Sequence, residues 1–386
     1  MNANSIRILH VIGGVMDFGG TEIFLMNYYR HIDRKKTQFD FLLTGLEKGV
    51  FDDEIKALGG NLYNVPSKKQ NLIKNLVGTY RILRDNKSSI VHSHLDGMNG
   101  LILGLSFLAG NKIRISHSHN TQHLTTNYFK VMIHNVFRVL SRLFATDYMS
   151  ASNEAAQWLH GKKITSKSNT VVVNAIDYTK YRFNPEVRTS LRNELGINER
   201  FVLGHVGRFH FQKNHVFMLE LVSQLVKQND SILLMLVGDG EIRSDIEAKI
   251  TELKIQKYVY LVGRAEDTSQ YYNVFDVFLL PSVFEGLGIV AIEAQVNGLN
   301  VLASTGVPHV ARISDRMAFL DTKDYGQWVI EITKLSEKIS KDKEQIETNR
   351  VKTQVDDNYD ILNTAGILVS KYIGLASLTQ KMTGNL

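Results

Sequence analysis

The chain has 386 residues, of which 44% are hydrophobic and 22% are charged, and its formal net charge is +6 at pH 7. This length predicts two domains of about 150–200 residues, and the composition is typical of a soluble globular protein. Cysteine does not occur, which excludes disulfides, a thiolate nucleophile and cysteine metal sites.

The basic balance suits acidic ligands, an anionic membrane surface or nucleic acid. No zinc finger, RRM-type aromatic motif or long basic run supports nucleic acid as a partner. The N-terminal residues are polar and lead into a short apolar run, unlike a signal peptide. No run approaches the roughly 18 apolar residues of a membrane-spanning helix, so a cytoplasmic protein is expected.

The first 175 residues alternate short apolar runs with amphipathic segments, which predicts a doubly wound, mostly parallel α/β sheet. Strands are expected at 6–12, 39–43, 61–65, 90–94, 112–116, 147–150 and 170–173. Helices are expected at 23–30, 52–58, 73–84, 99–109 and from 153 to about 160, with N-caps at Thr21 and Ser152.

A glycine-rich loop joins the first strand to the first helix. Gly13-Gly14 ends the strand, and Gly19-Gly20 precedes the helix. Ligands of open α/β sheets bind at such a loop. The spacing is not G-x-G-x-x-G, which argues against a nicotinamide-dependent dehydrogenase.

Two H-x-H pairs stand at strand ends, and polar residues follow each pair. The pairs are His92 with His94 and His117 with His119, followed by Asp96 and Asn120. Neither pair brings a carboxylate in metal-site spacing, so no metal site is expected. Polar loop histidines without a function remain an alternative to ligand contact.

Residues 125–145 combine aromatic, aliphatic and basic side chains at helical spacing. Such a segment is either an amphipathic helix that lies on anionic lipid or a core helix with one solvated face. The sequence leaves both interpretations open.

The second half begins with a strand at 201–206, followed by Arg208 and, five residues later, Lys213. At the end of one strand, these two side chains can converge on a pyrophosphate. A solvated basic loop is the alternative. Further strands are expected at 231–237, 258–262 and 274–280, and helices at 216–226, 269–273, 326–339 and 361–375.

Residues 281–304, PSVFEGLGIVAIEAQVNGLNVLAS, carry the strongest signal. Gly286 and Gly288 predict a turn, and 289–296 predicts a short helix whose free N-terminal amides and dipole form an anion site. Glu285 and Glu293 flank this site. A phosphate-binding terminus framed by two carboxylates suits a ligand with phosphates and hydroxyls, such as a nucleotide sugar.

This stretch resembles the signature of retaining glycosyltransferases of family 4, in which an acidic residue and a glycine turn precede E-A-x-x-x-G. Residues 207–214 resemble the family's G-R-x-x-x-x-K-N motif, 238–240 its G-D-G turn, and 174–177 its N-G-I-D hinge segment, with Ala175 in place of glycine. The family's proline after the last glycine is missing here. The similarity is specific over about 204–304 and looser over the first 180 residues.

The resemblance implies a GT-B fold of two Rossmann-like domains that face a central cleft. Residues 1–175 would form the acceptor domain, 176–360 the donor domain, and a helix at about 361–386 would cross back onto the first. It implies that Arg208, Lys213 and the amides of residues 288–290 neutralise the diphosphate leaving group. Glu293 would bind the ribose hydroxyls, and Glu285 would lie beside the sugar.

The remaining site residues also come from the resemblance. His119, in preference to His117, would lie near the C6 hydroxyl and the reacting carbon of the sugar, with Asp96 and Asn120 on the acceptor side. The other donor-binding candidates are Gly19, Gly20, Arg264, Gly286, Leu287, Gly288, Ile289 and Val290. Neither a metal nor another cofactor is required.

The resemblance therefore implies a retaining hexosyltransferase of capsule or exopolysaccharide synthesis that transfers a sugar, with UDP favoured over GDP as its carrier, to a saccharide or lipid-linked acceptor. Peripheral contact with the inner face of the plasma membrane would fit such an acceptor. The alternatives are a nucleotide-sugar epimerase of the same architecture, a dehydrogenase and a non-catalytic partner subunit. Glycoside hydrolysis is disfavoured, because the basic pair indicates a phosphate leaving group.

Overall fold

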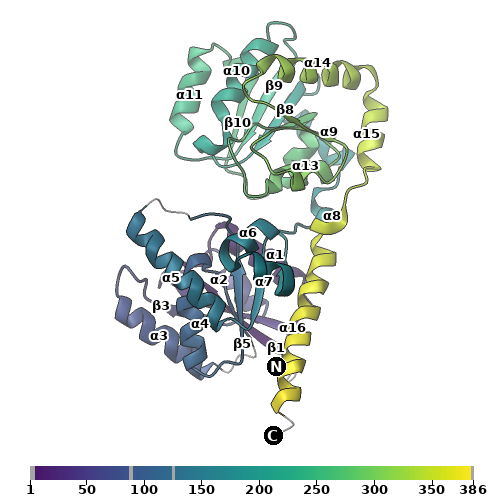
Figure 1. Cartoon of the computed structure of the whole chain (residues 1–386). Helices are drawn as coiled ribbons and strands as arrows, with labels where there is room; N and C mark the ends of the chain where they lie inside the picture. The colour runs from purple at the N-terminus through teal and green to yellow at the C-terminus, as the bar shows by residue number, and fades with distance from the viewer. Residues whose placement is uncertain (1–4, 87–89, 124–126, 384–386) are drawn as a thin grey trace. The chain divides into compact units, whose positions relative to one another are not determined.

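The computed structural model describes residues 5–86, 90–123 and 127–383 and divides into two compact units (Figure 1). Unit 1 consists of Met1–Ile176 and Asn358–Leu386, and unit 2 of Asp177–Asp357. The domain boundary expected from the sequence, between residues 175 and 176, lies next to this division.

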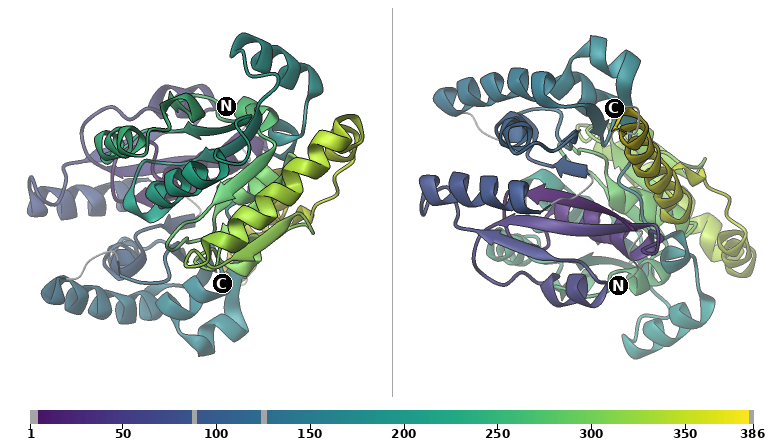
Figure 2. Two further views of the ribbon diagram at one scale, coloured as in Figure 1. Left: turned by 90° about the horizontal axis from the view of Figure 1, so that it is seen from above. Right: turned by 90° about the horizontal axis from the view of Figure 1, so that it is seen from below.

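Unit 1 contains a seven-stranded parallel sheet with the strand order β3-β2-β1-β4-β5-β6-β7. Its strands are β1 (Ile6–Ile12), β2 (Thr37–Thr44), β3 (Leu62–Val65), β4 (Ile90–Ser93), β5 (Ile113–Ser118), β6 (Asp147–Ser150) and β7 (Asn169–Val171). The central strands are almost wholly buried because helices cover both faces of the sheet (Figure 2). The strand order reverses between β1 and β4, so their carboxyl ends flank a switch point where α/β sheets bind ligands.

The helices of unit 1 form the two covering layers. They are α1 (Gly20–His31), α2 (Asp52–Ala57), α3 (Leu72–Asp85), α4 (Asn99–Leu108), α5 (Tyr128–Phe144), α6 (Asn153–His160), α7 (Lys162–Ser168) and α16 (Ile361–Thr383), with a 3-10 turn, η1 (Asp96–Met98). Ser152 caps α6 as predicted, since its side chain accepts a hydrogen bond from the amide of Ala155. The predicted cap at Thr21 is wrong, because α1 begins at Gly20 and its N-cap is Gly19, two residues before Thr21.

The C-terminal helix α16 has the length and composition to cross a membrane over Ile361–Leu378, where the mean hydropathy is 1.4. The expectation that no run of the chain has these properties is therefore wrong. Polar residues such as Asn363 interrupt the apolar run, but the mean hydropathy of the segment stays high. In unit 1 the helix packs on α1, β1, β2 and β5. Its core-facing side consists of Ile361, Ala365, Leu368, Val369 and Tyr372. These residues recur every three or four positions, so they lie on one face of the helix.

Unit 2 repeats the same topology with six parallel strands in the order β10-β9-β8-β11-β12-β13. They are β8 (Phe201–Val206), β9 (Ile232–Val237), β10 (Val259–Gly263), β11 (Val277–Leu280), β12 (Asn300–Ser304) and β13 (Met317–Leu320). Its helices are α8 (Tyr178–Tyr181), α9 (Pro185–Glu194), α10 (His215–Leu225), α11 (Arg243–Glu252), α12 (Ser269–Val274), α13 (Ile289–Val296), α14 (Tyr325–Lys341) and α15 (Lys343–Val351). The switch point of this sheet lies between β8 and β11.

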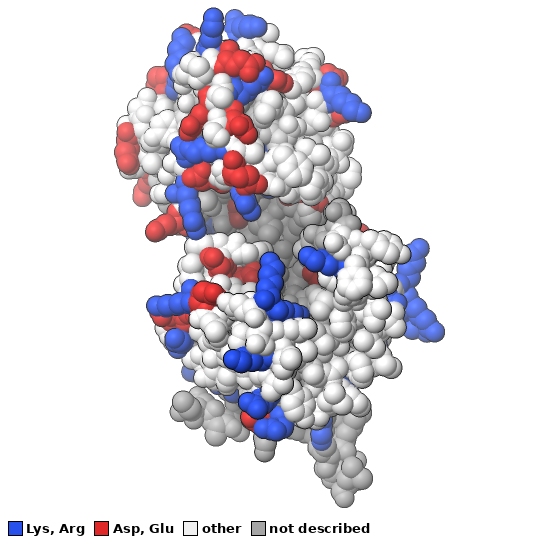
Figure 3. Space-filling model, turned by 90° about the vertical axis from the view of Figure 1, so that its left-hand side faces the viewer, with Lys and Arg blue, Asp and Glu red and all other residues white. Residues whose placement is uncertain are grey.

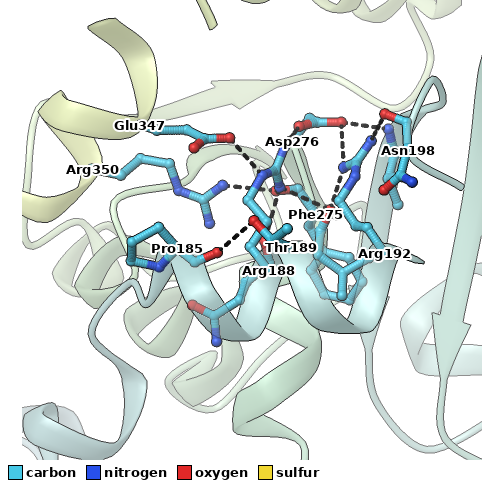
Figure 4. Close-up of polar contacts among 12 residues, drawn as sticks. Pro185, Arg188, Thr189, Arg192, Asn198, Phe275, Asp276, Glu347 and Arg350 are labelled. Carbon is cyan, nitrogen blue, oxygen red and sulfur yellow. Dashed lines mark hydrogen bonds and ion pairs between the residues drawn. The ribbon is translucent and has the colours of Figure 1, made fainter. Parts of the chain in front are cut away.

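A buried charge network lies at the amino ends of β8 and β11 (Figure 4). Asp276 accepts hydrogen bonds from Arg188 (2.5 Å), Arg192 (3.3 Å) and the amide of Val202 (2.8 Å). Burial opposes ionisation of Asp276, but the two guanidinium groups hold its pKa below the usual value. Arg188 also donates to the carbonyls of residues 273–275, so the network fixes α9 against the start of β11.

Candidate functional site

The switch point of unit 2 brings the two strongest sequence motifs to one edge of the sheet. The loop after β8 carries Arg208 and Lys213, and the loop after β11 carries Glu285 and leads into α13. The turn after β9 packs directly on the first loop. A Cβ atom at Gly238 would lie 1.9 Å from the carbonyl oxygen of Gly207, so only glycine permits this contact.

Lys213 and Glu285 form an ion pair across the switch point. The Lys213 Nζ lies 2.7 Å from Glu285 Oε1, which also accepts a hydrogen bond of 2.7 Å from the Ser282 hydroxyl. The two side chains are 16% and 7% exposed. A cation held this close to a carboxylate at a strand end can share its charge with an anionic ligand.

Arg208 has a different setting from Lys213. Its side chain is 74% exposed and its Nη2 lies 2.9 Å from Glu241 Oε2. The two basic side chains that sequence analysis expected to converge therefore contact different carboxylates. The guanidinium of Arg208 remains accessible to a ligand at this edge, because most of the side chain lies in solvent.

The turn before α13 has the conformation that the glycine pattern predicted. Gly288 is the N-cap of α13 and has φ 80° and ψ 48°, a left-handed conformation that favours glycine. A Cβ atom at Gly286 would meet open space. The amides of residues 288–290 stand at the start of the helix, where no preceding turn supplies acceptors, so this terminus favours an anion.

Glu293 lies one turn into α13 and is buried. Its carboxylate accepts a hydrogen bond from the hydroxyl of Tyr272 and is also bonded to Tyr181. Burial raises the pKa of Glu293, although both hydroxyls favour its ionised form. Two tyrosines thus hold a carboxylate below the glycine turn. Of the other donor-side candidates, Leu287, Ile289 and Val290 belong to this turn and helix start, and Arg264 is exposed after β10, two strands from β8.

The start of α1 in unit 1 is already covered by a carboxylate of its own. Gly19 and Gly20 begin the helix, and a Cβ atom at Gly19 would lie 2.1 Å from Glu22 Oε2. Burial raises the pKa of Glu22. An anionic ligand at this terminus would therefore compete with Glu22 for the same amides.

The histidine candidates lie at the carboxyl ends of β4 and β5, next to Asp96 and Asn120. Asp96 accepts hydrogen bonds from the amide of His119 (2.7 Å) and from the side-chain amide of Asn120 (2.6 Å). His117 is fully buried, whereas His119 is partly exposed. The structure therefore brings these four candidates together, with His119 as the ring that is nearer to solvent.

The two H-x-H pairs and His10 of β1 pack into one cluster on the sheet. Burial lowers the pKa of His10 and of His119 to about 3, and it lowers the pKa of the other three rings well below the usual value. All five imidazoles are thus neutral at neutral pH. The position of His10 in register with His92 explains why it joins the cluster.

Several residues of these sites were missed by sequence reasoning. Ser282 stands within the recognised motif and could have been noted, since it lies three residues before Glu285. Glu241, Tyr272 and Tyr181 act through tertiary contacts with Arg208 or Glu293 that no local spacing reveals. His10 stands alone in its strand, so its pairing with the other histidines depends on the strand order.

The family match lies in unit 2, and the similar proteins cover most of the chain. Residues 187–352 match the model of the family "Glycosyl transferases group 1". EpsF of Bacillus subtilis (strain 168), named as a glycosyltransferase, is 35% identical over 312 residues, which cover 80% of this chain and 81% of EpsF. CapH of Staphylococcus aureus, a capsular polysaccharide biosynthesis glycosyltransferase, is 26% identical over 78% of this chain and 81% of its own.

A further relative is the UDP-Gal:alpha-D-GlcNAc-diphosphoundecaprenol alpha-1,3-galactosyltransferase of Escherichia coli, 27% identical over 69% of this chain and 72% of that protein. Among solved structures, Anabaena Alr3699/HepE in complex with UDP aligns with a TM-score of 0.70 at 17% identity, over 99% of this chain and 100% of that chain. HepE is also known in complex with UDP-glucose. The two Rossmann-like units are those of the GT-B fold, and the identity to EpsF over four fifths of both chains shows that this chain belongs to the glycosyl transferases group 1.

Proposed function

We propose that this protein is a retaining hexosyltransferase of family 4 that transfers a sugar from a UDP-sugar to a saccharide or lipid-linked acceptor during cell-surface polysaccharide synthesis. The observation that carries this proposal is the arrangement at the switch point of unit 2. One edge of a sheet there combines two cations, a helix N-terminus and two carboxylates. Phosphates suit the first two features, and hydroxyls suit the last.

The leaving group is a nucleoside diphosphate in this proposal. Lys213, Arg208 and the amides of residues 288–290 neutralise the charge that grows on the diphosphate as the glycosidic bond breaks. Because side chains and backbone supply this stabilisation, the transfer needs no metal at the diphosphate. Glu293 accepts hydrogen bonds from the ribose hydroxyls, and its tyrosine partners orient it.

Glu285 is assigned to the transferred sugar, where it holds hydroxyls or stabilises positive charge at the reacting carbon. Its ion pair with Lys213 links that sugar contact to the phosphate contact. On unit 1, His119 is assigned to the sugar, with Asp96 and Asn120 on the acceptor side. Retention with attack from the face of the leaving group, whose phosphate helps to deprotonate the acceptor, completes the proposed reaction.

UDP is proposed over GDP because HepE, which shares the fold, is known in complexes with UDP and UDP-glucose. A thermal-shift screen of UDP, GDP, ADP, TDP and NAD without added metal tests this choice, since a ligand that binds the native state raises its apparent stability. Stabilisation by UDP alone is expected. Stabilisation by GDP alone would change the donor but keep the reaction, whereas stabilisation by NAD alone, or by none of them, would contradict the proposal.

The acceptor side includes a proposed membrane contact, made by what we call the α5 face. It consists of side chains that are between 47% and 84% exposed: Tyr128, Phe129, Met132, Val136, Val139 and Leu143. Among the residues of α5, only Ser141 is buried. The other side of α5 packs on α4 through Phe137, Leu140 and Phe144, so a packed helix with one solvated face stays the alternative. The exposed apolar stripe is what supports contact with lipid. Residues 125 and 126 of the predicted segment lie outside the described residues.

The charge around the α5 face suits an anionic lipid surface. Residues 127–168 contain six Lys and Arg but two Asp and Glu, and α5 itself has no acidic residue. Figure 3 shows Lys and Arg of unit 1 over an otherwise mostly uncharged surface. Arg138 and Arg142 are anchored by hydrogen bonds to carbonyls at the end of α6, so Lys130 and the lysines of α7 are the cations free to meet lipid head groups. The E. coli relative is named for a diphosphoundecaprenol-linked substrate, and a lipid-linked acceptor of that kind would be reached from such a surface. Contact at the inner face of the plasma membrane is part of this proposal.

Sedimentation with lipid vesicles tests the α5 face. Binding to vesicles that contain phosphatidylglycerol is expected, with little binding to pure phosphatidylcholine. Val136→Asp together with Leu143→Asp should abolish it, because both place a carboxylate on the apolar stripe. Ile330→Asp, at a similarly exposed apolar position on α14, is the matched control. Equal binding of the double variant and the wild type would contradict this part of the proposal.

A further inference from the structure

The histidine cluster of unit 1 has an internal order, and its rings other than His119 have no part in the proposed transfer. Its members come from β1, from the end of β4 and from the end of β5: His10, His92, His94, His117 and His119. Centroids of neighbouring rings are 4.2 to 5.2 Å apart. Five imidazoles in one core bring together many nitrogens that can bind a transition metal, whereas apolar side chains usually fill such a core.

The rings form two hydrogen-bonded chains. In the first, His119 Nε2 lies 2.8 Å from His94 Nδ1, and His94 Nε2 lies 2.9 Å from His10 Nδ1. In the second, His117 Nδ1 lies 3.0 Å from His92 Nε2, and His92 Nδ1 lies 2.8 Å from the Tyr372 hydroxyl. His117 Nε2 is buried and has no hydrogen-bond partner among the described residues.

We propose that His94, His117 and His119 bind one divalent transition-metal ion of the zinc class. The three side chains offer ligand atoms that lie within 4.8 Å of one another. Neutral imidazole is a preferred ligand of zinc, and three histidines with a fourth, open position form a known zinc arrangement. His119 is the partly exposed member, so the fourth position and the entry path lie on its side.

The outer members of the cluster orient the proposed ligands. A histidine that binds metal through one nitrogen generally donates its other N–H to a fixed acceptor. Here His94 can donate through Nε2 to His10, and His117 through Nδ1 to His92, which in turn donates to Tyr372. This single assignment of protons leaves His94 Nδ1, His117 Nε2 and His119 Nε2 as lone pairs for the ion.

The ion would replace one hydrogen bond. Two nitrogens of a tetrahedral zinc site are roughly 3.3 Å apart, given zinc–nitrogen distances of about 2.0–2.1 Å. His94 Nδ1 and His119 Nε2, now 2.8 Å apart, must therefore separate by about half an ångström. A second possible group, His10 with His92 and His94, is less suited, because both nitrogens of His92 are bonded to residues outside that group, Tyr372 and His117.

All three ligands are nitrogens, so the site should exclude Mg²⁺ and Ca²⁺, which prefer oxygen. The inference does not rest on the proposed transfer. The two proposals share His119, so a bound ion would engage the ring that is assigned to the sugar. Because the readout here is bound metal rather than activity, absence of bound Zn²⁺ would overturn this inference and leave the proposed transfer standing.

Calorimetric titration of the untagged, chelator-treated chain with Zn²⁺ tests the site, with the absorption spectrum of bound Co²⁺ as a report on tetrahedral nitrogen coordination. One ion per chain is expected. His117→Gln and His119→Gln should each abolish stoichiometric binding, and His10→Gln should weaken it by roughly ten- to hundredfold through loss of an orienting partner.

His160→Gln is the matched control, because His160 is buried in the same unit but bonds to Ser116 outside the cluster. It should bind as the wild type does. The partly exposed position of His119 keeps the test valid if His117→Gln fails to fold. Absence of stoichiometric Zn²⁺ binding in the wild type, or unchanged binding in the His117 and His119 variants, would overturn the inference.

Discussion

The two edges of the unit 2 sheet use the same kinds of side chain for opposite purposes. At the amino edge, Arg188 and Arg192 meet Asp276 with side chains that are 4–5% exposed. At the carboxyl edge, Lys213 meets Glu285 in partial burial, and Arg208 meets Glu241 in solvent. Residue type alone therefore does not separate a structural ion pair from a ligand-binding one.

The two kinds of ion pair differ in how many hydrogen-bond partners the fold supplies to the cation. The guanidinium of Arg188 donates to three backbone carbonyls besides two carboxylates, so the fold satisfies most of its hydrogen-bonding capacity. Arg208 has a single carboxylate contact among the described residues, which leaves donors for a ligand. In unit 2, buried charges thus stabilise the fold at the amino edge, and accessible charges remain at the carboxyl edge. The four variants below test this difference, in order of their expected effect on unfolding.

The largest effect is expected for Asp276→Asn. Removing this buried charge leaves Arg192 without its carboxylate and Arg188 with Glu347 alone, and the free energy of unfolding should fall by about 3–5 kcal/mol. Urea unfolding measures this change. Asp245→Asn, at an exposed position of α11, is the control and should leave the unfolding curve unchanged. A loss as small as that of the control would show that the amino edge is not structural.

Lys213→Ala should reduce both stability and turnover. Glu285 would retain the Ser282 hydroxyl but lose its cation, at a cost of about 1–3 kcal/mol in the free energy of unfolding. Turnover should fall by on the order of a hundredfold or more, as for the loss of one charge-stabilising donor. Both are measured on the same purified variant.

Lys249→Ala is the control for Lys213, because Lys249 also pairs with carboxylates of unit 2, Glu220 and Glu252, away from the switch point. Its turnover should equal that of the wild type. If Lys213→Ala also turned over at the wild-type rate, the lysine would be a structural partner of Glu285 and the division between the two edges would fail.

The contrast between the edges also explains what the sequence could predict. Strand β8 and the alternation of strands and helices were predicted because buried parallel strands leave continuous apolar runs. The glycine turn at Gly288 was predicted because its left-handed backbone restricts the residue type. Helix α15 was missed, because its mixed charged sequence reads as solvated chain until Arg350 is seen to be buried.

The amino-edge network was not predicted at all, since Arg188 and Asp276 are 88 residues apart and neither stands in a motif. In the carboxyl-edge site, the local motifs indicated which residues gather but not their partners. Arg208 was expected to converge with Lys213, yet each contacts its own acid. Long-range pairing depends on strand order, which no local spacing encodes.

Glu293→Gln probes the buried carboxylate at the carboxyl edge. Burial raises the pKa of Glu293 in the native state, so the folded protein binds a proton more readily than the unfolded chain does. The wild type should therefore gain stability as pH falls from the native pKa towards the usual value near 4.3, and glutamine cannot share this gain. As the pH is lowered from 8 to 5, the unfolding free energy of the variant should therefore fall relative to that of the wild type.

The same variant should bind UDP roughly ten- to hundredfold more weakly, because a charged acceptor for the ribose is lost. Glu220→Gln is the control: Glu220 also accepts a tyrosine hydrogen bond, from Tyr325, but its side chain is partly exposed and lies away from the switch point. It should alter neither UDP affinity nor the pH dependence. Wild-type affinity in Glu293→Gln would assign Glu293 to the fold rather than to the ligand.

Arg208→Ala should have the smallest effect on unfolding, with a urea midpoint equal to that of the wild type. Its ion pair with Glu241 lies in solvent, where attraction is screened and holding two long side chains in place costs entropy. Turnover should nevertheless fall by on the order of a hundredfold, as for Lys213→Ala. Glu241→Gln serves as the control, since it removes the same ion pair but leaves the guanidinium, and its turnover should be retained. A loss of activity without a loss of stability is what separates a charge kept for a ligand from one kept for the fold, and a variant that unfolds early while still transferring sugar would place Arg208 with the amino-edge arginines.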